Sequence, residues 1–555
     1  MGKNNQNAWG TRVGLILAMA GNAVGLGNFL RFPVQAVQNG GGAFIIPYLV
    51  CFLLLGIPLL WVEWAMGRYG GRNGNHSTPF ILDSMGNRQR LWKYIGVFGI
   101  FTNIAVAAYY CYIESWTMSY TMHSAMGTFQ GMDQMQVASF FKSYLDIEIS
   151  TTGIPYEPII FFITCVVLNS WVLGKGLAGV ERVAMVGMPM LLLFAIVLAF
   201  RAVTLGTSGA SPQHPDASAI DGINFLWTPQ YQSLYDPKVW LAAAGQIFFT
   251  LALGLGSIQC YASYLRSKDD IALNAVSAGF MNEFVEVVLG GAIVIPIAAG
   301  YLGLDWVKEN ASFGMAFQTM PYLFQKWGPI LGAAAGVMWF GLLFFAGITS
   351  SLAMGTPWVG FMRDEFKWSN AKGAWSFGLM LIVLGLPTVV FYNEGVFDEY
   401  DYWGGTISLV IFATAEAILF SWIFGIQKGW QEITMSSDIK VPSFFKPILL
   451  YVTPVMLILV LLGALISPEA NNWLGAFQSL GAGNGWPLSN GSIISQLFNT
   501  GLHQQIATAK GDGATILKNK LMYVNGARAL LLALFVGICI LVYVANAKRK
   551  KQQVA

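Results

Sequence analysis

The stretch Gly21-Asn22-Ala23-Val24-Gly25-Leu26-Gly27-Asn28 lies in the middle of the first long apolar segment of the chain. Glycine is among the poorest helix formers, so this sequence predicts a break in a helix. The sixth apolar segment carries a similar stretch, Phe249-Thr250-Leu251-Ala252-Leu253-Gly254-Leu255-Gly256. Non-helical backbone at membrane depth survives only where protein or water satisfies its polar groups. The two stretches therefore predict two broken helices that line a cavity.

For either stretch alone, close packing of two helices through small residues is an alternative. Paired breaks in the first and sixth segments favour a different interpretation, a binding site at the interface of two inverted five-helix repeats. Such breaks expose backbone carbonyls that can coordinate a cation and helix ends that can face a carboxylate.

Composition indicates a membrane protein around these stretches. The 555 residues are 55% hydrophobic and only 11% charged, whereas a soluble domain is roughly a quarter charged. The mean hydropathy is +0.56. The formal net charge of +3 is small and argues against nucleic-acid binding. The five cysteines lie within apolar runs, so neither a disulfide framework nor a metal site is expected from them.

Apolar runs of about 20 residues, the length that spans a bilayer as a helix, predict an all-α integral membrane protein with twelve transmembrane helices. Spans 1–5 and 6–10 would form the two inverted repeats, with two extra helices after them. The expected divisions are 1–204, 205–424 and 425–555, and the last contains a long extracellular insert at 469–525. The twelve spans lie near 12–36, 42–70, 91–125, 158–174, 183–204, 239–264, 270–300, 329–362, 373–391, 396–424, 446–468 and 526–547.

Lysine and arginine gather between the second and third spans and in the carboxyl-terminal tail. Because these residues are enriched in cytoplasmic loops, both termini are expected to be cytoplasmic. Three acidic residues inside spans, Glu63, Glu114 and Glu416, are expected to anchor hydrogen bonds within the bundle.

The chain resembles the neurotransmitter:sodium symporter family, and within it the bacterial leucine transporters. The resemblance rests first on A-M-A-G-N-A-V-G-L-G-N-F-L-R-F-P and N-G-G-G-A-F between Trp9 and Gly71. It continues through Tyr109-Tyr110, Gly245–Gly256, Asn282–Glu286, Phe345–Ser351 and Asp398–Gly405. It covers the first ten spans well and the last two only loosely.

The resemblance implies two sodium sites, and sodium as a hard cation prefers oxygen ligands. The first would be formed by Ala23, Asn28, Thr250 and Asn282 with the substrate carboxylate as a further ligand. The second would be formed by Gly21, Val24, Ala346, Thr349 and Ser350. The last three lie at i, i+3 and i+4 on one helix face. Hydrogen bonds from Thr349 and Ser350 to their own helix are the alternative.

The resemblance also implies a substrate site for a small neutral amino acid. Its carboxylate would meet Leu26, Gly27 and the Tyr110 hydroxyl, and its amine would face carbonyls at Ala23, Phe249 and Thr250. The whole expected set is Asn22, Ala23, Leu26, Gly27, Val106, Tyr110, Phe249, Thr250, Ala252, Leu255, Ser350, Ala353 and Met354. Relatives that bind biogenic amines carry an aspartate where this chain has Gly25, so an amine without a carboxylate would lack its counter-ion.

Two gates are implied in the same way. Arg31 and Asp401 would close the outer side, with Tyr110 and Phe249 as a lid over the substrate. Ser263, Tyr264 and Asp364 match the inner gate, but the arginine that relatives carry three residues before Trp9 is Gln6 here. Either Lys3 substitutes for it or the inner side closes less firmly, which predicts a larger inward-open population.

Chloride-dependent relatives have a small serine where this chain has Glu286, one turn after Asn282. The carboxylate of Glu286 would supply the negative charge that chloride supplies elsewhere, so no chloride requirement is expected.

The expected function is sodium-coupled import of small neutral, hydrophobic amino acids by alternating access. The expected location is a prokaryotic plasma (inner) membrane, and the oligomeric state is left open. A non-transporting amino-acid sensor and an ion-conducting channel on the same scaffold are the alternatives. An enzyme is not expected, because no H-E-x-x-H, G-x-S-x-G or P-loop motif occurs in the sequence.

Overall fold

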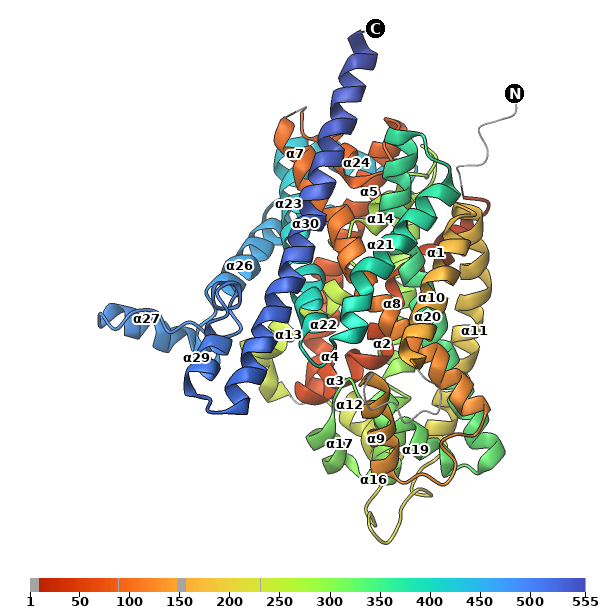
Figure 1. Cartoon of the computed structure of the whole chain (residues 1–555). Helices are drawn as coiled ribbons and strands as arrows, with labels where there is room; N and C mark the ends of the chain where they lie inside the picture. The colour runs from red at the N-terminus through yellow and green to blue at the C-terminus, as the bar shows by residue number, and fades with distance from the viewer. Residues whose placement is uncertain (1–8, 88, 147–155, 230, 555) are drawn as a thin grey trace.

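The computed structural model describes residues 9–87, 89–146, 156–229 and 231–554. Within these ranges the regular structure is helical, and the strand-like pairs are two isolated bridges, Ser211 with His214 and Pro468 with Leu488. The helices run side by side in one bundle (Figure 1).

Nine helices in the described ranges are long and apolar enough to cross a membrane. They are Gly42–Arg72, Leu91–Ala125, Leu177–Val203, Ile271–Leu302, Pro329–Phe366, Asn370–Val390, Val396–Thr434, Phe445–Leu465 and Asp512–Gln552. A tenth candidate is a bent pair, Arg12–Ala23 with Leu26–Gln38, whose two parts meet at 51°. The expectation of a multi-spanning helical protein is therefore confirmed.

Two predicted spans take other forms. The segment predicted at 158–174 is the helix α10 (Glu157–Leu173), which is apolar but has only 17 residues. The segment predicted at 239–264 is split into α13 (Pro237–Thr250) and α14 (Ser257–Ala262). The interruption between them is the second break that the glycines predicted.

Several long helices contain π-helical turns, where one residue is added to a turn of the helix. The first spans are built from α1 (Arg12–Ala23), α2 (Leu26–Leu30), α3 (Phe32–Gln38), α4 (Gly42–Cys51), η2 (Phe52–Gly56), α5 (Ile57–Arg72), α7 (Arg90–Ile95), α8 (Val97–Ala125) and α11 (Leu177–Val203). The middle spans are built from α15 (Ile271–Glu283), η4 (Phe284–Gly290), α16 (Val294–Leu302), α20 (Pro329–Phe366) and α21 (Asn370–Val390).

The last spans and the connections complete the chain. The last spans are α22 (Val396–Tyr400), η5 (Asp401–Ser408), α23 (Leu409–Ile418), η6 (Leu419–Gly425), α24 (Ile426–Thr434), α25 (Phe445–Pro447), η7 (Ile448–Val452), α26 (Thr453–Leu465) and α30 (Asp512–Val554). The connections hold α6 (Thr78–Met85), α9 (Gln134–Leu145), α12 (Ala219–Trp227), η3 (Tyr231–Tyr235), α17 (Leu304–Asn310), α18 (Met315–Gln318), α19 (Met320–Gln325), η8 (Glu469–Asn471), α27 (Trp473–Gly481), α28 (Ile493–Leu497) and α29 (Thr500–Thr508).

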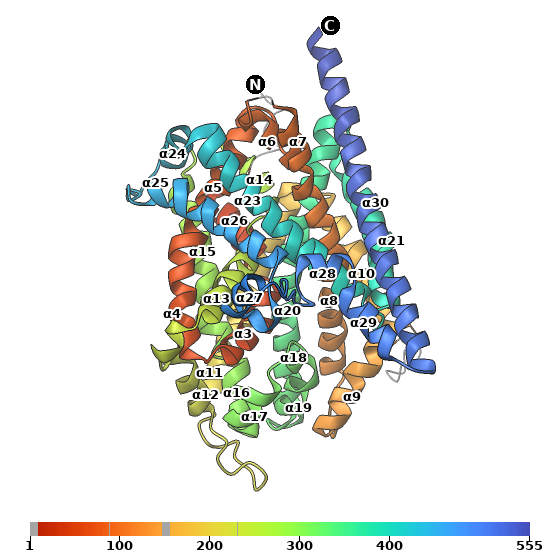
Figure 2. The same cartoon turned by 90° about the vertical axis from the view of Figure 1, so that its left-hand side faces the viewer.

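The last helix begins earlier than the sequence predicted. The hydrophobic run predicts a span at 526–547, but α30 starts at Asp512, inside the segment 469–525 that was expected to be an insert. Polar residues continue a helix readily once an apolar part has formed it, because many of them have good helix propensity. Figure 2 shows α30 running along one edge of the bundle and α26 crossing its face.

Two arginines fasten α30 to the bundle, one in its first half and one near its carboxyl end. Arg528 Nε donates to Glu399 Oε2 at 2.6 Å and Nη2 donates to Glu399 Oε1 at 3.0 Å, which ties α30 to α22. Near the carboxyl end, Arg549 Nε donates to Glu365 Oε2 at 2.8 Å, which ties α30 to the end of α20. Two-pronged arginine–carboxylate pairs hold geometry better than single contacts.

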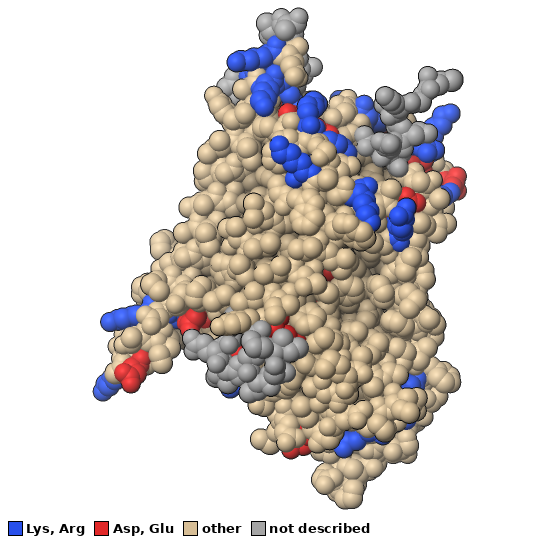
Figure 3. Space-filling model, turned by 45° about the vertical axis from the view of Figure 1, so that its right-hand side comes forward, with Lys and Arg blue, Asp and Glu red and all other residues tan. Residues whose placement is uncertain are grey.

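Charged side chains gather at the ends of the molecule. On the face shown in Figure 3, lysine and arginine cluster at the end where α30 finishes, and a broad band of uncharged side chains lies between the two ends. This band is the surface that a lipid bilayer would cover, because charge is costly in hydrocarbon.

Candidate functional site

The first break lies between α1 and α2, at Val24 and Gly25. The Gly25 N–H donates to Asn28 Oδ1 at 2.8 Å, and the Leu26 N–H donates to the Tyr110 hydroxyl at 3.1 Å. The break thus has polar partners, as non-helical backbone needs inside a membrane. A Cβ placed on Gly25 would lie 2.9 Å from the Tyr110 hydroxyl, so the close approach requires glycine.

The second break covers the six residues between α13 and α14. Ala252, Gly254 and Gly256 have φ values of +54°, +75° and +83°. Glycine adopts this left-handed region easily, while alanine does so at a steric cost. The Gly254 N–H donates to Glu63 Oε1 at 2.7 Å, so this buried carboxylate holds the break in place. Glu63 is therefore a hydrogen-bond anchor of the kind that the sequence predicted.

The two breaks face one cavity of about 410 Å³. Both broken helices, α8, α20 and the tenth predicted span all contribute to its wall. Twelve of the expected substrate residues line it, namely Asn22, Ala23, Leu26, Gly27, Val106, Tyr110, Phe249, Thr250, Ala252, Leu255, Ser350 and Met354. Ala353 is buried on α20 and lies outside this lining.

Sequence reasoning missed the outer part of the cavity wall. It is aromatic to a large extent and includes Trp116, Phe313, Tyr392 and Phe397. Phe313 comes from the connection between α17 and α18, far from any motif that pointed to the site. Only Phe397 adjoins such a motif, because it directly precedes Asp398.

The side chains expected at the first sodium site form one buried network. Asn28 Nδ2 donates to Asn282 Oδ1 at 2.9 Å, and Asn282 Nδ2 donates to Thr250 Oγ1 at 3.0 Å. Ala23, the last residue of α1, lines the cavity beside them. A cation here would draw the amide oxygens toward itself in place of these hydrogen bonds. The oxygen atoms fit a hard cation such as sodium.

Glu286 belongs to the same network. Gln246 Nε2 donates to Glu286 Oε1 at 2.8 Å, and the Thr250 hydroxyl donates to Glu286 Oε2. All three side chains are buried. Gln246 was not among the predicted residues, since a glutamine inside a span carries no local signal of its partner.

The residues expected at the second sodium site lie where α1 meets α20. Ser350 Oγ is 3.2 Å from the Gly21 carbonyl oxygen and 3.2 Å from the Ala346 carbonyl oxygen. Thr349 Oγ1 donates to Phe345 O at 2.9 Å, and a Cβ on Gly21 would lie 2.9 Å from Thr349 Cβ. Val24 is the first residue after α1, and its N–H donates to the Ala20 carbonyl oxygen at 2.6 Å. The two hydroxyls thus bond back to their own helix, as the alternative held, and Ser350 also reaches α1.

The residues expected at the outer gate both line the cavity but are not paired. The guanidinium carbon of Arg31 lies 4.2 Å from the centre of the Phe249 ring. Asp401 Oδ1 instead accepts from the Tyr109 hydroxyl at 2.6 Å. Among the described residues no ion pair joins Arg31 to Asp401. The outer side is therefore not closed by this pair in the present structure.

The residues expected at the inner gate meet at the opposite end of the bundle. The Tyr264 hydroxyl accepts from Arg363 Nη2 at 2.8 Å, and Asp364 Oδ1 lies 3.0 Å from the same nitrogen. His76 Nδ1 is 2.9 Å from Ser263 Oγ. Gln6 and Lys3 lie outside the described residues. His76 and Arg363 were not predicted, because neither stands in a recognisable motif.

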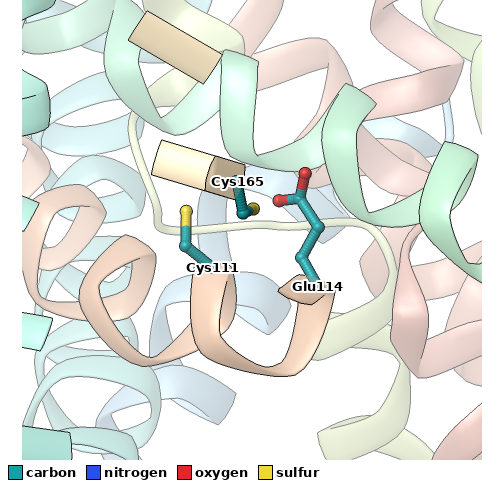
Figure 4. A group of neighbouring side chains, drawn as sticks. All are labelled: Cys111, Glu114 and Cys165. Carbon is teal, nitrogen blue, oxygen red and sulfur yellow. The ribbon is translucent and has the colours of Figure 1, made fainter. Parts of the chain in front are cut away.

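A separate buried cluster joins α8 to α10 (Figure 4). Ligand atoms of Cys111, Glu114 and Cys165 all lie within 4.8 Å of one another. Asn169 Nδ2 donates to Glu114 Oε1 at 3.1 Å and to Cys165 Sγ at 3.6 Å. The Ser351 hydroxyl in turn donates to Asn169 Oδ1 at 2.8 Å. Thiols suit soft metals and not sodium. The cluster therefore links α8, α10 and α20, with Glu114 as an anchor.

Comparison with known proteins places this architecture in a family. The model of the sodium:neurotransmitter symporter family matches the chain over residues 6–132 and 129–499. The chain belongs to this symporter family. The family is one of transporters, so the expectation that the chain is not an enzyme is confirmed.

Relatives of this symporter family are found in archaea and in animals. An uncharacterized sodium-dependent transporter of Methanocaldococcus jannaschii is 30% identical over 467 residues, which cover 81% of this chain and 89% of the relative. The sodium-dependent nutrient amino acid transporter 1 of Drosophila pseudoobscura pseudoobscura is 25% identical over 519 residues, or 84% of this chain and 76% of the relative.

A solved structure shares the fold of this chain. The crystal structure of MhsT in complex with L-phenylalanine matches with a TM-score of 0.70 and 26% identity, and the match covers 82% of this chain and 99% of that chain.

Proposed function

We propose that this chain imports a neutral, apolar amino acid together with sodium by alternating access. The observation that carries the proposal is the cavity between the two breaks, where backbone groups, a tyrosine hydroxyl and two clusters of oxygen atoms converge. The names of the relatives support sodium and an amino acid as the two solutes.

The backbone at the breaks provides the contacts for the two charged ends of an amino acid. The N–H groups of Leu26 and Gly27 open α2, where a helix leaves its first N–H groups without internal partners. The Tyr110 hydroxyl already accepts from Leu26, so its own proton remains for the substrate carboxylate. The amine would face the carbonyls at Ala23, Phe249 and Thr250, at the ends of α1 and α13, where the last carbonyls of a helix lack their regular intrahelical partners. The Phe249 oxygen accepts from the Ala252 N–H at 3.2 Å and would use its second lone pair.

Sodium would couple to the amino acid through the shared carboxylate. The first sodium ion would lie among Ala23, Asn28, Thr250 and Asn282, next to that carboxylate. The second would lie among Gly21, Val24, Ala346, Thr349 and Ser350 and fix α1 against α20. Glu286 accepts from the Thr250 hydroxyl, so its carboxylate would place a negative charge beside the first site without chloride.

The substrate side chain would lie against apolar residues of three helices. This part of the cavity is lined by Val106 of α8, by Ala252 and Leu255 of the second break, by Met354 of α20 and by Phe249. Gly25 offers no carboxylate to an amine, so a neutral, hydrophobic amino acid fits better than a biogenic amine. The flexible methionine would let the pocket accept more than one side chain.

The proposal includes a membrane topology. It has twelve spans, with α10 and the α13–α14 pair counted among them, and spans 1–5 and 6–10 as inverted repeats. The divisions 1–204, 205–424 and 425–555 follow from this topology. Both termini would lie in the cytoplasm of a prokaryotic cell, in agreement with the lysine and arginine clustered where α30 ends.

Binding of a labelled amino acid to the purified protein tests the site. We expect saturable binding in sodium buffer and at least about tenfold weaker binding when choline replaces sodium. The reason is that the carboxylate of the amino acid would no longer coordinate a sodium ion. Competition by a panel of amino acids should rank neutral, apolar ones first. Equal binding in both buffers would contradict the coupling, and binding without any flux into vesicles would favour a sensor.

A further inference from the structure

The inner halves of the two broken helices lie together at the cytoplasmic end proposed above. The Trp9 Nε1–H donates to the Tyr261 carbonyl oxygen at 3.2 Å, and the two rings meet edge to face at 5.2 Å. Ser263 and Tyr264 follow α14 directly. If the cavity is to open inward, this end of α14 must separate from α20, so contacts between them decide how firmly the inner side is closed.

Arg363 of α20 provides the first such contact. Its Nη2 donates both to the Tyr264 hydroxyl at 2.8 Å and to Asp364 Oδ1 at 3.0 Å, and its Nε is 3.2 Å from the same oxygen. The side chains of Arg363 and Asp364 are only 20% and 12% exposed. One guanidinium therefore neutralises Asp364 and holds the phenol of Tyr264 at the same time.

His76, in the connection between α5 and α6, provides the second contact. Its backbone N–H donates to Asp364 Oδ2 at 3.0 Å, and its ring stacks on Tyr264 with centroids 4.4 Å apart. The Ser263 hydroxyl donates to the Cys260 carbonyl oxygen at 2.6 Å. Because a hydroxyl has one hydrogen to donate, Ser263 accepts from His76 Nδ1, and this ring nitrogen carries the hydrogen. His76 thus joins three chain segments.

We propose that Arg363 and His76 hold the cytoplasmic gate of this chain shut, in the role that related chains give to an arginine before the first span. Position 6 is a glutamine, which carries no charge to pair with Asp364. Arg363 supplies that charge from α20 itself, and His76 connects Ser263, Tyr264 and Asp364. This inference rests on the proposed function, because it assigns these residues to the inner gate of a transporter.

Hydrogen–deuterium exchange of residues 257–264 in the full protein, held in lipid nanodiscs, tests the proposal. We expect Arg363→Gln and His76→Ala each to speed exchange in this segment on the order of tenfold, as loss of a charge-assisted or buried hydrogen bond would. The matched control is Lys268→Gln, which removes an exposed charge at the same end of the molecule. Exchange equal to wild type in both gate variants, with the control also unchanged, would overturn the proposal.

A double variant separates a specific contact from general loosening. If Arg363 acts through Tyr264, then Arg363→Gln combined with Tyr264→Phe should exchange no faster than Arg363→Gln alone. Multiplied effects would show that the two side chains act independently and would contradict the assignment. Sodium-driven uptake is measured on wild type and the same variants reconstituted into proteoliposomes. Wild-type uptake with unaltered exchange in the variants defeats only this inference, whereas altered exchange without any sodium-driven uptake defeats only the proposed function.

Discussion

Gly25 and Tyr110 approach each other so closely that a Cβ on Gly25 would lie 2.9 Å from the Tyr110 hydroxyl. Both residues line the cavity, at the position where the family resemblance implies an aspartate in relatives that bind amines. The same hydroxyl accepts from the Leu26 N–H at 3.1 Å. The close approach leaves little room for a side chain at position 25, and under the proposed function the tyrosine would meet the substrate carboxylate.

Gly25→Ala should weaken amino-acid binding by roughly tenfold or more, because the added methyl group displaces the Tyr110 hydroxyl and overpacking costs about 1–3 kcal/mol. The equilibrium dissociation constant for a labelled neutral amino acid measures this effect. Gly245→Ala is the matched control, since a Cβ at Gly245 in α13 meets nothing within 4 Å. An unchanged constant in Gly25→Ala would show that the carboxylate binds elsewhere.

The glycine breaks could be predicted from the sequence because glycine acts locally on the backbone. The spacing of Ala346, Thr349 and Ser350 likewise predicted a shared helix face. Hydrogen bonds between distant residues could not be predicted in this way. Examples are the pairs Gln246 with Glu286, Glu63 with Gly254, and His76 with Ser263. These pairs are more than 35 residues apart in the chain, and helix packing alone brings them together.

The shape of the second break was also beyond prediction. Ala252 has a φ of +54°, in a region that alanine rarely adopts, so propensity alone would have placed it within a helix. The neighbouring glycines and the Glu63 carboxylate impose this conformation. The extension of α30 before its hydrophobic run also has partners distant in the chain: Tyr523 stacks on Phe391 with ring centroids 4.5 Å apart, and Asn525 accepts from Asn499 at 3.1 Å.

Thr349→Val should raise the sodium concentration for half-maximal binding about tenfold, because it keeps the shape of the side chain and removes one oxygen ligand. Valine would also fill the space next to Gly21, where a Cβ on the glycine would lie 3.2 Å from the Thr349 methyl carbon. Thr388→Val is a suitable control, since the Thr388 hydroxyl bonds to Gly385 O within α21 at 2.7 Å. Equal sodium dependence in both variants and wild type would exclude Thr349 from a sodium site.

Glu286→Ser should make transport depend on chloride. In the wild-type chain the carboxylate accepts from Thr250 and from Gln246 Nε2, the latter at 2.8 Å, and under the proposed function it would supply the negative charge beside the first sodium site. The serine variant loses this charge and leaves a small space that an anion could fill. Uptake is compared in chloride and gluconate buffers. A variant that transports at the same rate in both would show that Glu286 does not stand in for chloride.

Acid should loosen the inner gate through His76. Burial lowers the pKa of His76 from its ordinary value of 6.5, Asp364 opposes this shift, and Arg363 adds to it. Ser263 and the Tyr264 ring face it from the end of α14, and the Arg549–Glu365 pair of α30 and α20 lies along the same cleft.

A group whose pKa is lowered by burial favours the closed form while it stays neutral, and this advantage falls as pH drops below the ordinary value. Exchange of residues 257–264, relative to the intrinsic rate at each pH, should therefore rise as the pH is lowered from about 7.5 to about 5.5. The rise should disappear in His76→Asn and persist in His503→Asn, which replaces an exposed histidine of α29. A rise that persists in His76→Asn would assign the effect to another group.

Uptake of a labelled neutral, apolar amino acid into proteoliposomes tests sodium-coupled transport most directly. With sodium outside and choline inside, we predict accumulation above the external concentration, and with choline on both sides only slow equilibration. Protein-free vesicles give the background in each case. Uptake that is the same with and without the sodium gradient would contradict the account.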